Sequence, residues 1–335
     1  MNDILGLKKY LNYARKLNSF LSMDRQRSWK YGICRPDLLA RGFLSQRARL
    51  YPFDQYDYSL FLNDWKIEFH LYKLHDHIVQ SFISNKLLFH LFLKEQLPEG
   101  VTAGLVGIVV KNTFLSFSKF VRMEEALTEA GFLIAKPISG AGGKFVRRID
   151  TLPHDFGMDG FLIETGIRPH PYASAINPNS VNTIRVLTLK DPDTGKPFVA
   201  GAAHRFGTHR TGCVDNFSRG GLCALVDVET GTLSAAKSNP GLYPSDRHPR
   251  HCDSGAAIEG VTVPYWEEAK ELCLKVASII PGLLHVGWDV AITGNGPVIV
   301  EGNARTANPN IIQAHRPLLV NPRVRRFYEF HGILP

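Results

Sequence analysis

The stretch HVGWDVAITGNGPVIVEGNA, residues 285–304, contains two β-rich runs on either side of the turn sequence Gly294-Asn295-Gly296-Pro297. Two strand-like runs around such a turn predict a β-hairpin. If the turn is centred on Asn295, the strands pair so that Asp289 lies directly opposite Glu301. Side chains alternate between the two faces of a strand. The apolar face of this hairpin is therefore expected to contain Val286, Trp288, Val290, Ile292, Val298 and Val300.

The opposite face of the hairpin carries three polar side chains, Asp289, Glu301 and Asn303. Two carboxylates that face each other, with Cβ atoms about 5 Å apart, repel each other unless a positive charge lies between them. Oxygen ligands at this spacing suit a hard cation, and Mg²⁺ bound together with substrate phosphates is the common case. The pattern therefore predicts a magnesium site, and the alternative is an acidic hairpin that faces solvent.

A second motif, GFLIAKPISGAGGKFVRRI, occupies residues 131–149. One strand ends at Lys136, a loop of small residues follows at 139–143, and a second strand comes next. Glycines allow backbone N–H groups to approach an anion closely. The motif is not a P-loop, which would need other residues than Ile138 and Phe145, and the strand after the loop excludes the dinucleotide fingerprint. It predicts either a flexible hairpin that closes over phosphates or an ordinary turn.

A third motif is the hairpin expected from VNTIRVLTL (181–189) and PFVAGAAHRF (197–206). Arg185 lies among apolar residues in the first strand, and Arg205 lies near the end of the second. A charged side chain in such surroundings needs a partner. Phosphate or carboxylate groups of a ligand suit arginine, and an Asp or Glu of the protein would serve equally. The loop VDNFSRGG (214–221) has the composition of an anion-contacting loop.

The whole chain has 335 residues, of which 44% are hydrophobic, so it can form globular cores and roughly two domains. Short β-rich runs and helical segments at 3–30, 86–97, 123–130 and 265–280 predict a mixed α+β fold. Apolar runs are shorter than the ~20 residues of a membrane-spanning helix. The first residues lack the features of a secretory signal, and a cytoplasmic location is expected.

Residues 1–50 contain eleven Lys or Arg and three Asp, which equals the net charge of +8. This basic segment is expected to pack on the protein through its leucines, or to make weak contact with an anionic surface. Nucleic acid is not an expected partner, because no nucleic-acid motif accompanies the charge. The five cysteines are expected to be reduced. Zinc binding at His248, His251 and Cys252 would lack a second pair of ligands.

The motifs follow one another as a Lys-Pro strand, a glycine loop, Glu164 near a strand end, NTIR, RFG, VDNF, GWD and EGN. This order resembles the ATP-grasp superfamily, and more closely the ATP-grasp proteins associated with sugar transfer, from about Lys86 to Gln313. The resemblance implies an α+β ATP-grasp fold, with the nucleotide between two antiparallel sheets and a helical N-terminal extension. The expected parts are the extension (1–80), an N-terminal α/β part (81–122), a lid (123–168) and a C-terminal domain with the metal site (169–335).

The resemblance also implies roles for particular residues. The expected cofactors are ATP and two Mg²⁺ ions, with Mn²⁺ able to substitute. Arg185, Arg205 and Asn216 would be catalytic. The metal ligands would be Asp289, Glu301 and Asn303, and the residues that bind ATP would be Lys86, Lys136, Ser139, Gly140, Gly142, Gly143 and Glu164.

The reaction implied by the resemblance joins a carboxylate to an amine through an acyl phosphate and releases ADP and phosphate. A sugar acid or an amino-acid-type compound is the expected substrate, and proteins of a sugar-transfer pathway are candidate partners. Two alternatives stay open. One is a phosphotransferase on the same scaffold, and the other is a nucleotide-binding module without turnover, against which the intact set of metal ligands argues.

Overall fold

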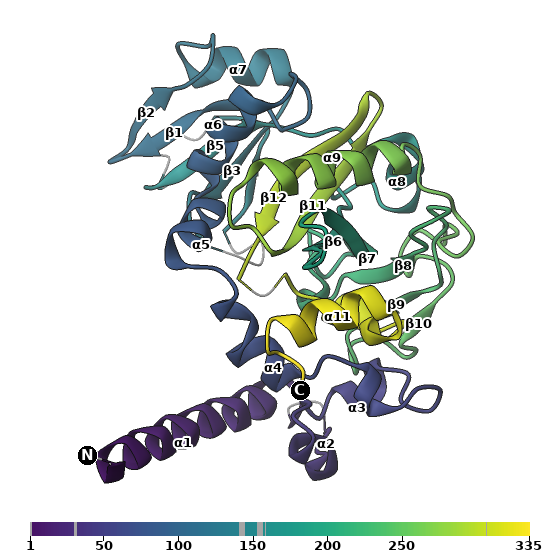
Figure 1. Cartoon of the computed structure of the whole chain (residues 1–335). Helices are drawn as coiled ribbons and strands as arrows, with labels where there is room; N and C mark the ends of the chain where they lie inside the picture. Colours follow the sequence, from purple (N-terminus) through teal and green to yellow (C-terminus); the bar gives the residue numbers. More distant parts are fainter. Residues whose placement is uncertain (1, 30–31, 141–144, 153–156, 158, 306) are drawn as a thin grey trace.

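The structure is a computed structural model that describes residues 2–29, 32–140, 145–152, 157, 159–305 and 307–335, with side chains from residue 10 onward. Two antiparallel sheets dominate the fold (Figure 1), one of five strands in the order β2-β1-β5-β3-β4 and one of seven in the order β10-β9-β8-β7-β6-β11-β12. The expected α+β class with two antiparallel sheets is confirmed. The strands are β1 (Leu105–Val110), β2 (Thr113–Ser116), β3 (Leu133–Pro137), β4 (Arg147–Ile149), β5 (Phe161–Thr165), β6 (Ile184–Lys190), β7 (Pro197–Phe206), β8 (Leu222–Val226), β9 (Ala236–Ser238), β10 (Arg247–His248), β11 (His285–Thr293) and β12 (Gly296–Asn303).

The five-stranded sheet is covered by a helix on each face. On one face, Met123 and Ala126 of α7 (Met123–Ala130) pack in a cluster with Val106 and Ile163 of the sheet. On the other, α6 (Lys86–Gln96) packs against the sheet through its leucines. The side chain of Asn85 caps α6 by accepting a hydrogen bond from the backbone N–H of Leu88.

This sheet takes strands from both sides of residue 122, where the sequence places a domain boundary. Strand β1 lies before the boundary and pairs with β5 after it, so residues 105–165 share one sheet. The expected division of the chain into domains stays a prediction.

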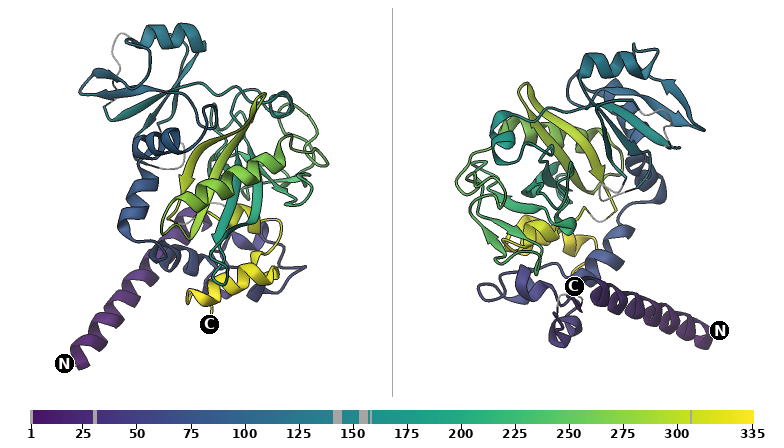
Figure 2. Two further views of the ribbon diagram at one scale, coloured as in Figure 1. Left: turned by 45° about the horizontal axis from the view of Figure 1, so that its top comes forward. Right: turned by 180° about the vertical axis from the view of Figure 1, so that it is seen from behind.

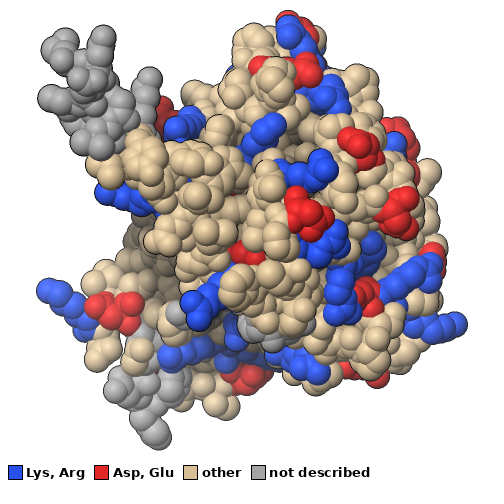
Figure 3. Space-filling view, turned by 90° about the horizontal axis from the view of Figure 1, so that it is seen from below, with Lys and Arg blue, Asp and Glu red and all other residues tan. Residues whose placement is uncertain are grey.

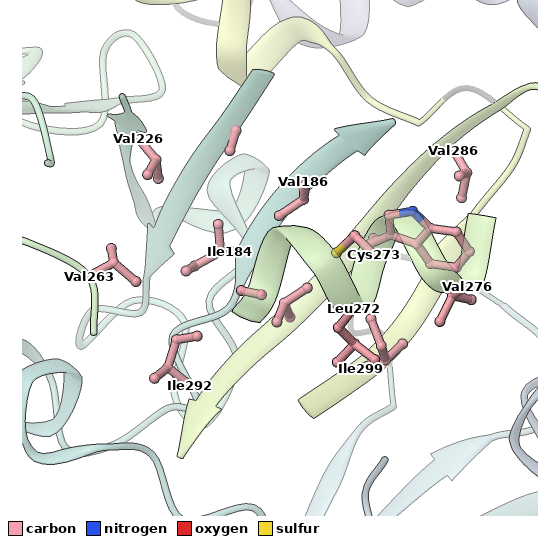
Figure 4. Close-up of a cluster of buried hydrophobic side chains, with 14 of the residues drawn as sticks. Ile184, Val186, Val226, Val263, Leu272, Cys273, Val276, Val286, Ile292 and Ile299 are labelled. Atoms are coloured by element: carbon pink, nitrogen blue, oxygen red, sulfur yellow. The ribbon is translucent and has the colours of Figure 1, made fainter. Parts of the chain in front are cut away.

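The seven-stranded sheet buries its two faces differently. One face packs under α9 (Trp266–Ile279), and Figure 4 shows Leu272, Cys273 and Val276 of this helix among the aliphatic side chains of the central strands. Along β6, Ile184 and Val186 belong to this core, whereas Leu187 belongs to a second core on the opposite face. Because side chains alternate along a strand, Arg185 is directed away from the α9 face.

The second core combines the sheet with both ends of the chain. Leu187 and Leu189 pack with α11 (Pro322–Phe330) and with aromatic residues of the N-terminal extension such as Tyr51 and Phe61. Four other α-helices contribute to this core, α2 (Pro36–Ala40), α3 (Arg47–Leu50), α4 (Asp64–Phe69) and α10 (Asn310–Gln313). The other α-helices that precede α6 are α1 (Asn2–Arg27) and α5 (His77–Ser84), and Ile83 of α5 packs in the core under α9. The extension is therefore part of a shared core with the seven-stranded sheet.

Helix α1 is anchored mainly by its C-terminal turns, and in its middle Tyr13 and Lys16 lie near the rings of Trp65 and Phe69. The buried carboxylate of Asp24 accepts hydrogen bonds from the hydroxyl of Ser28 (2.7 Å), the indole N–H of Trp29 (3.1 Å), and the backbone N–H and hydroxyl of Ser45 (2.6 and 2.8 Å). Phe20 is 1% exposed. The rest of the helix extends away from the body of the protein (Figures 1 and 2).

The expectation that the basic segment packs through its leucines is confirmed for Leu38, Leu44 and Leu50, which are at most 1% exposed, but it is wrong for the described leucines of α1. Leu11, Leu17 and Leu21 are 55%, 38% and 45% exposed, because the face of α1 that turns toward the protein is the one with Phe20 and Asp24. Among the described helices, we find none with both the length and the apolar character needed to cross a membrane.

Candidate active site

A cavity of about 390 Å³ lies between the two sheets, and we call it the intersheet cavity. The five-stranded sheet contributes Lys136 and Glu164, and the seven-stranded sheet contributes Arg185, Asp289 and Glu301. A cavity of about 370 Å³ adjoins it on the α6 side, since Lys136 and Glu301 line both. Motifs that are far apart in the sequence therefore meet in one place.

The hairpin of β11 and β12 pairs Asp289 with Glu301, so the predicted opposition of the two carboxylates is confirmed. Asn303 pairs with Gly287 in the same register. The three predicted metal ligands therefore lie along one edge of the intersheet cavity, which all three line.

The register between Asp289 and the turn differs from the prediction. Val290 pairs with Ile299 and Ala291 pairs with Val298, because the turn is tighter than expected and an extra residue in β12 makes a bulge. As a result Ile299 joins the core with Val290, while Val300 lines the intersheet cavity. The assignment of Val298 and Val300 to the core face was wrong for this reason.

Both predicted catalytic arginines bind Asp289. Nε and Nη2 of Arg185 donate to the carboxylate at 2.6 and 3.1 Å, and Nη2 of Arg205 lies 3.0 Å from Oδ2. The side chains of Arg185 and Asp289 are 5% and 3% exposed. Burial by itself would raise the pKa of Asp289, but the charges of Arg185 and Arg205 lower it well below its usual range. Asp289 is therefore a fixed negative charge held by two buried cations.

Asp215 provides Arg205 with a second carboxylate, at 3.5 Å. Asp215 Oδ2 accepts hydrogen bonds from the backbone N–H and hydroxyl of Thr183 at 2.5 and 2.7 Å, and Arg205 Nη2 donates to the same hydroxyl. Asp215 and Thr183 line the cavity, and neither of these two was predicted as a site residue. The anion-contacting composition of the loop 214–221 was the feature of the sequence that could have identified Asp215.

The lysine side of the cavity is a second buried charge cluster. Lys136 Nζ lies 2.7 Å from Glu164 Oε2, and His90 Nδ1 lies 3.3 Å from Glu164 Oε1. Burial favours protonation of Glu164, yet Lys136 and His90 lower its pKa. Glu164 lies in the central strand β5, with β1 and β3 on either side, and after it Thr165 and Ile167 line the cavity. The ATP-binding role expected for Glu164 stays a prediction.

Lys86 connects the two charge clusters. Its Nζ donates to the carbonyl of Gly140 at 2.7 Å and lies 3.9 Å from Glu301 Oε2. Burial lowers the pKa of Lys86, although Glu301 opposes this effect. His90 lies one helical turn further along α6 and so shares a face with Lys86, a spacing that could have identified it as a site residue.

The other predicted residues have mixed outcomes. Asn216 lines the cavity, and its side chain accepts a hydrogen bond from the backbone N–H of Ser218, at the start of the 3-10 helix η4 (Phe217–Arg219). Ser139 is exposed and is not among the described residues that line the cavity. Gly142 and Gly143 lie outside the residues that the structure describes.

The structure does not support zinc binding by His248, His251 and Cys252. His251 and Cys252 lie close together with Asp253, and His248 is not in this group. Nε2 of His251 lies 2.8 Å from the carbonyl of Gly207, so a structural contact already uses this nitrogen. The predicted trio is therefore not brought together among the residues described.

The charges of the site are balanced before any ligand binds. Each lysine or arginine lies within 4 Å of at least one carboxylate. A polyphosphate would bring several negative charges into this balanced site, and it therefore needs accompanying cations. The balance is made by the cations Lys86, Lys136, Arg185 and Arg205 and the anions Glu164, Asp215, Asp289 and Glu301.

The donors around Glu301 fit a hard metal ion. Burial, reinforced by the adjacent charge of Asp289, raises the pKa of Glu301. Among the described residues its cation partner is Lys86, at 3.9 Å, whereas Arg185 and Arg205 lie 2.6 and 3.0 Å from Asp289. Asn303 lies next to Glu301, with Nδ2 3.3 Å from Glu301 Oε1. Oxygen donors next to an under-neutralised carboxylate are suited to Mg²⁺.

Two antiparallel sheets with a charged cavity between them match the ATP-grasp arrangement expected from the sequence. A family model described as sugar-transfer associated ATP-grasp matches residues 153–324, just over half of the chain. The chain therefore belongs to the sugar-transfer associated ATP-grasp family. A search of curated proteins found no match.

Solved structures with a similar fold include several ligases. D-alanyl-alanine synthetase A from Vibrio cholerae is 13% identical with a TM-score of 0.41, and the match covers 74% of this chain and 66% of that one. N5-carboxyaminoimidazole synthase from Aspergillus clavatus is 12% identical with a TM-score of 0.39, over 69% and 47%. D-alanine–D-alanine ligase from Bacillus anthracis, complexed with ATP, is 14% identical with a TM-score of 0.41, over 77% and 70%. These likenesses are too distant to support an argument about activity.

The two facing carboxylates should respond differently to neutralisation. Asp289→Asn removes the shared partner of two buried arginines, and we expect it to lower the free energy of unfolding by about 3–5 kcal/mol. Glu301→Gln removes a charge that its surroundings disfavour, so the free energy of unfolding of this variant should be no lower than that of the unchanged protein. Urea denaturation in the presence of a chelator measures both. Equal losses in the two variants would contradict this account of the site.

Proposed function

We propose that this protein is an ATP- and Mg²⁺-dependent ligase that joins a carboxylate to an amine. The observation that carries the proposal is the intersheet cavity, where Lys86 and Lys136 face Arg185, Arg205 and the carboxylates of the hairpin. Family membership supports nucleotide binding, and the cavity supplies charged groups of both signs that suit a metal–triphosphate complex.

The nucleotide base would lie in the apolar part of the cavity, against Ile134, Ile167 and Val181. Lys136 and Lys86 would contact the phosphates, with the segment around Gly140 above them. The lysines are held by Glu164 and by the Gly140 carbonyl, so their positions are fixed before ATP binds.

Glu301 and Asn303 would hold Mg²⁺ together with Asp289, and we propose two ions for which Mn²⁺ can substitute. When bound, the metal neutralises charge on the phosphates and the transferring phosphoryl group. Arg205 retains hydrogen-bonding capacity, because its buried Nε has no partner among the described residues. Arg185 and Arg205 would stabilise negative charge at the reacting centre, with Asn216 lining the same wall.

The proposed reaction has two steps. A carboxylate oxygen of the substrate attacks the γ-phosphorus of ATP, the bond to the bridging oxygen breaks, and ADP leaves. The amine then attacks the acyl carbon, phosphate leaves, and the amine nitrogen loses a proton. The first step is needed because a bare carboxylate resists nucleophiles. A sugar acid or an amino-acid-type compound is the proposed substrate, and a phosphotransferase would use the same ATP-binding half of the cavity.

Product mass distinguishes these reactions. We expect incubation with ATP, Mg²⁺ and mixtures of sugar acids and amino acids to give ADP, phosphate and a product equal to the two substrates minus water. Glu301→Gln should abolish this product. Mass spectrometry checks both outcomes. A product heavier by one phosphoryl group would instead identify a phosphotransferase, and ATP binding without any product would indicate a binding module.

Lys136→Ala should weaken nucleotide binding about 10- to 100-fold, because a charge-assisted contact to phosphate is lost. Calorimetric titration with a non-hydrolysable ATP analogue in the presence of Mg²⁺ gives the affinity. Lys119→Ala is a matched control, since Lys119 is 70% exposed and pairs with Glu129 on the same part of the fold. If the two variants bind the analogue equally well, Lys136 does not contact the nucleotide.

We propose a weak contact between residues 1–50 and an anionic surface, besides contact with proteins of a sugar-transfer pathway. Tyr10 and Leu11 of the projecting helix are 68% and 55% exposed. Figure 3 views this end of the molecule, where basic side chains are spread over the surface with acidic ones between them. Exposed apolar side chains with basic neighbours favour a salt-sensitive interfacial contact.

Removal of residues 1–12 should abolish sedimentation with phosphatidylserine vesicles at low salt and leave the melting temperature nearly unchanged. The truncation keeps Tyr13, whose ring lies 5.7 Å from that of Trp65, and it keeps the anchor at Asp24. The intact chain should lose vesicle binding in high salt. Equal binding by the intact and shortened chains would rule out the projecting helix as the contact.

A further inference from the structure

A third cavity, of about 600 Å³, lies where the N-terminal extension meets the seven-stranded sheet, and we call it the extension cavity. Gln26, Arg27 and Gln46 of the extension form one side of it. Its volume is within the range of about 300–1,000 Å³ that is typical of small-molecule sites. Phe217, Ser218 and Asn308 line both this cavity and the intersheet cavity, so the two are neighbours with a common wall.

The lining of the extension cavity is rich in carboxamides. A carboxamide both donates and accepts hydrogen bonds, as a hydroxyl group does, so several of them can pair with a ligand that carries many hydroxyl groups. Phe217, Ile67 and Ile311 add apolar surface for the C–H groups of such a ligand. The carboxamide side chains are those of Gln26, Gln46, Asn239, Asn308 and Asn310.

Gln46 is the most buried of these carboxamides. It is only 7% exposed, and its side chain has no hydrogen-bond partner among the described residues. Its backbone N–H is fixed by the hydroxyl of Ser28 at 3.1 Å. The carboxamide atoms of Gln46 keep some exposure to the cavity, so they are available to a ligand. A ligand in the cavity would pair with Gln46, and also with the half-buried Asn239 and the exposed Asn308.

The charges of the extension cavity are already matched. Arg47 donates to Asp64 at 2.6 and 3.1 Å, and both side chains are at most 5% exposed. Arg27 lies 3.6 Å from Glu68. Each arginine in the described lining therefore has a carboxylate of its own, and the cavity suits a neutral ligand better than a phosphate or carboxylate.

The common wall links this cavity to the reacting centre. Ala307 and Asn308 both have left-handed backbone conformations, with φ of 51°. Such conformations are uncommon for residues other than glycine. Arg185 Nη1 donates to the Ala307 carbonyl at 2.9 Å, so the arginine that holds Asp289 also fixes the backbone between the cavities.

We propose that the extension cavity binds the neutral, hydroxyl-rich part of a saccharide substrate. The reacting group of this substrate would extend past Phe217 and Ser218 toward Arg185 and Arg205. The proposal rests on the proposed ligase function, for which it names the substrate class. The extension then serves to recognise the substrate, in addition to its structural contacts.

Saturation-transfer NMR with the full chain tests this assignment. The probes are glucose, galactose and N-acetylglucosamine at millimolar concentration, with a non-hydrolysable ATP analogue and Mg²⁺ present. We expect at least one sugar to give a signal that persists with the analogue bound. Gln46→Leu should weaken that sugar's binding about 3- to 10-fold, the effect of losing a hydrogen bond between neutral groups.

Asn239→Leu alters a lining residue that comes from outside the extension, and it should have the same effect. This second variant keeps the test decisive if Gln46→Leu does not fold. Gln55→Leu, at an exposed position of the extension, should leave the sugar signal unchanged. Three outcomes would overturn the assignment. The sugars could give no signal, the ATP analogue could displace the signal, or both cavity variants could leave the signal unchanged. The product-mass assay with ATP and Mg²⁺ separates this result from failure of the proposed function, in which no product equal to the two substrates minus water would form.

Discussion

Asp289 is held in a nearly water-free position by Arg185 and Arg205, and the organisation of the site depends on this buried ion cluster. The three residues lie on the adjacent strands β6, β7 and β11 in the interior of the seven-stranded sheet. A buried carboxylate without partners would be protonated, and buried guanidinium groups without a carboxylate would be strongly destabilising. Each charge is therefore stable only because the sheet holds the other two, and the strand register fixes all three positions together.

This cluster determines what the rest of the cavity can bind. Because Asp289 already neutralises two arginines, Glu301 is the carboxylate that most needs a cation, and Lys86 at 3.9 Å is its nearest one. Lys136 is likewise neutralised by Glu164. A bare triphosphate would find no uncompensated cation in the described lining, whereas a metal–triphosphate complex brings its own positive charge. Charge balance in the empty cavity thus favours binding of metal and nucleotide together.

Much of this arrangement was predictable from the sequence, and the exceptions have physical causes. The helices at 123–130 and 265–280 and the opposition of Asp289 and Glu301 were confirmed, because periodicity and turn residues act locally. The bulge in β12 was not predictable, since a turn with two glycines permits more than one register. Sequence patterns also cannot show which charges meet when residues are far apart in the chain, as Arg185 and Asp289 are. The exposed leucines of α1 were misjudged because helical spacing does not show which face is covered.

The residues of the site come both from the segment that the family model matches and from outside it. The residues proposed to act on the phosphoryl group lie within 153–324, the segment that defines the family, whereas Lys86 and Lys136 precede it. The extension lies outside this segment, yet its aromatic residues complete the core behind the sheet that carries Arg185. Its position beside the reacting centre is therefore fixed by the same packing that stabilises the sheet. A chain with this arrangement can change the groups it presents from the extension, as at Gln46, without disturbing the ion cluster at Asp289. Recognition of the substrate and activation by ATP are thus physically separable, because one depends on carboxamides of the extension and the other on charges of the sheet.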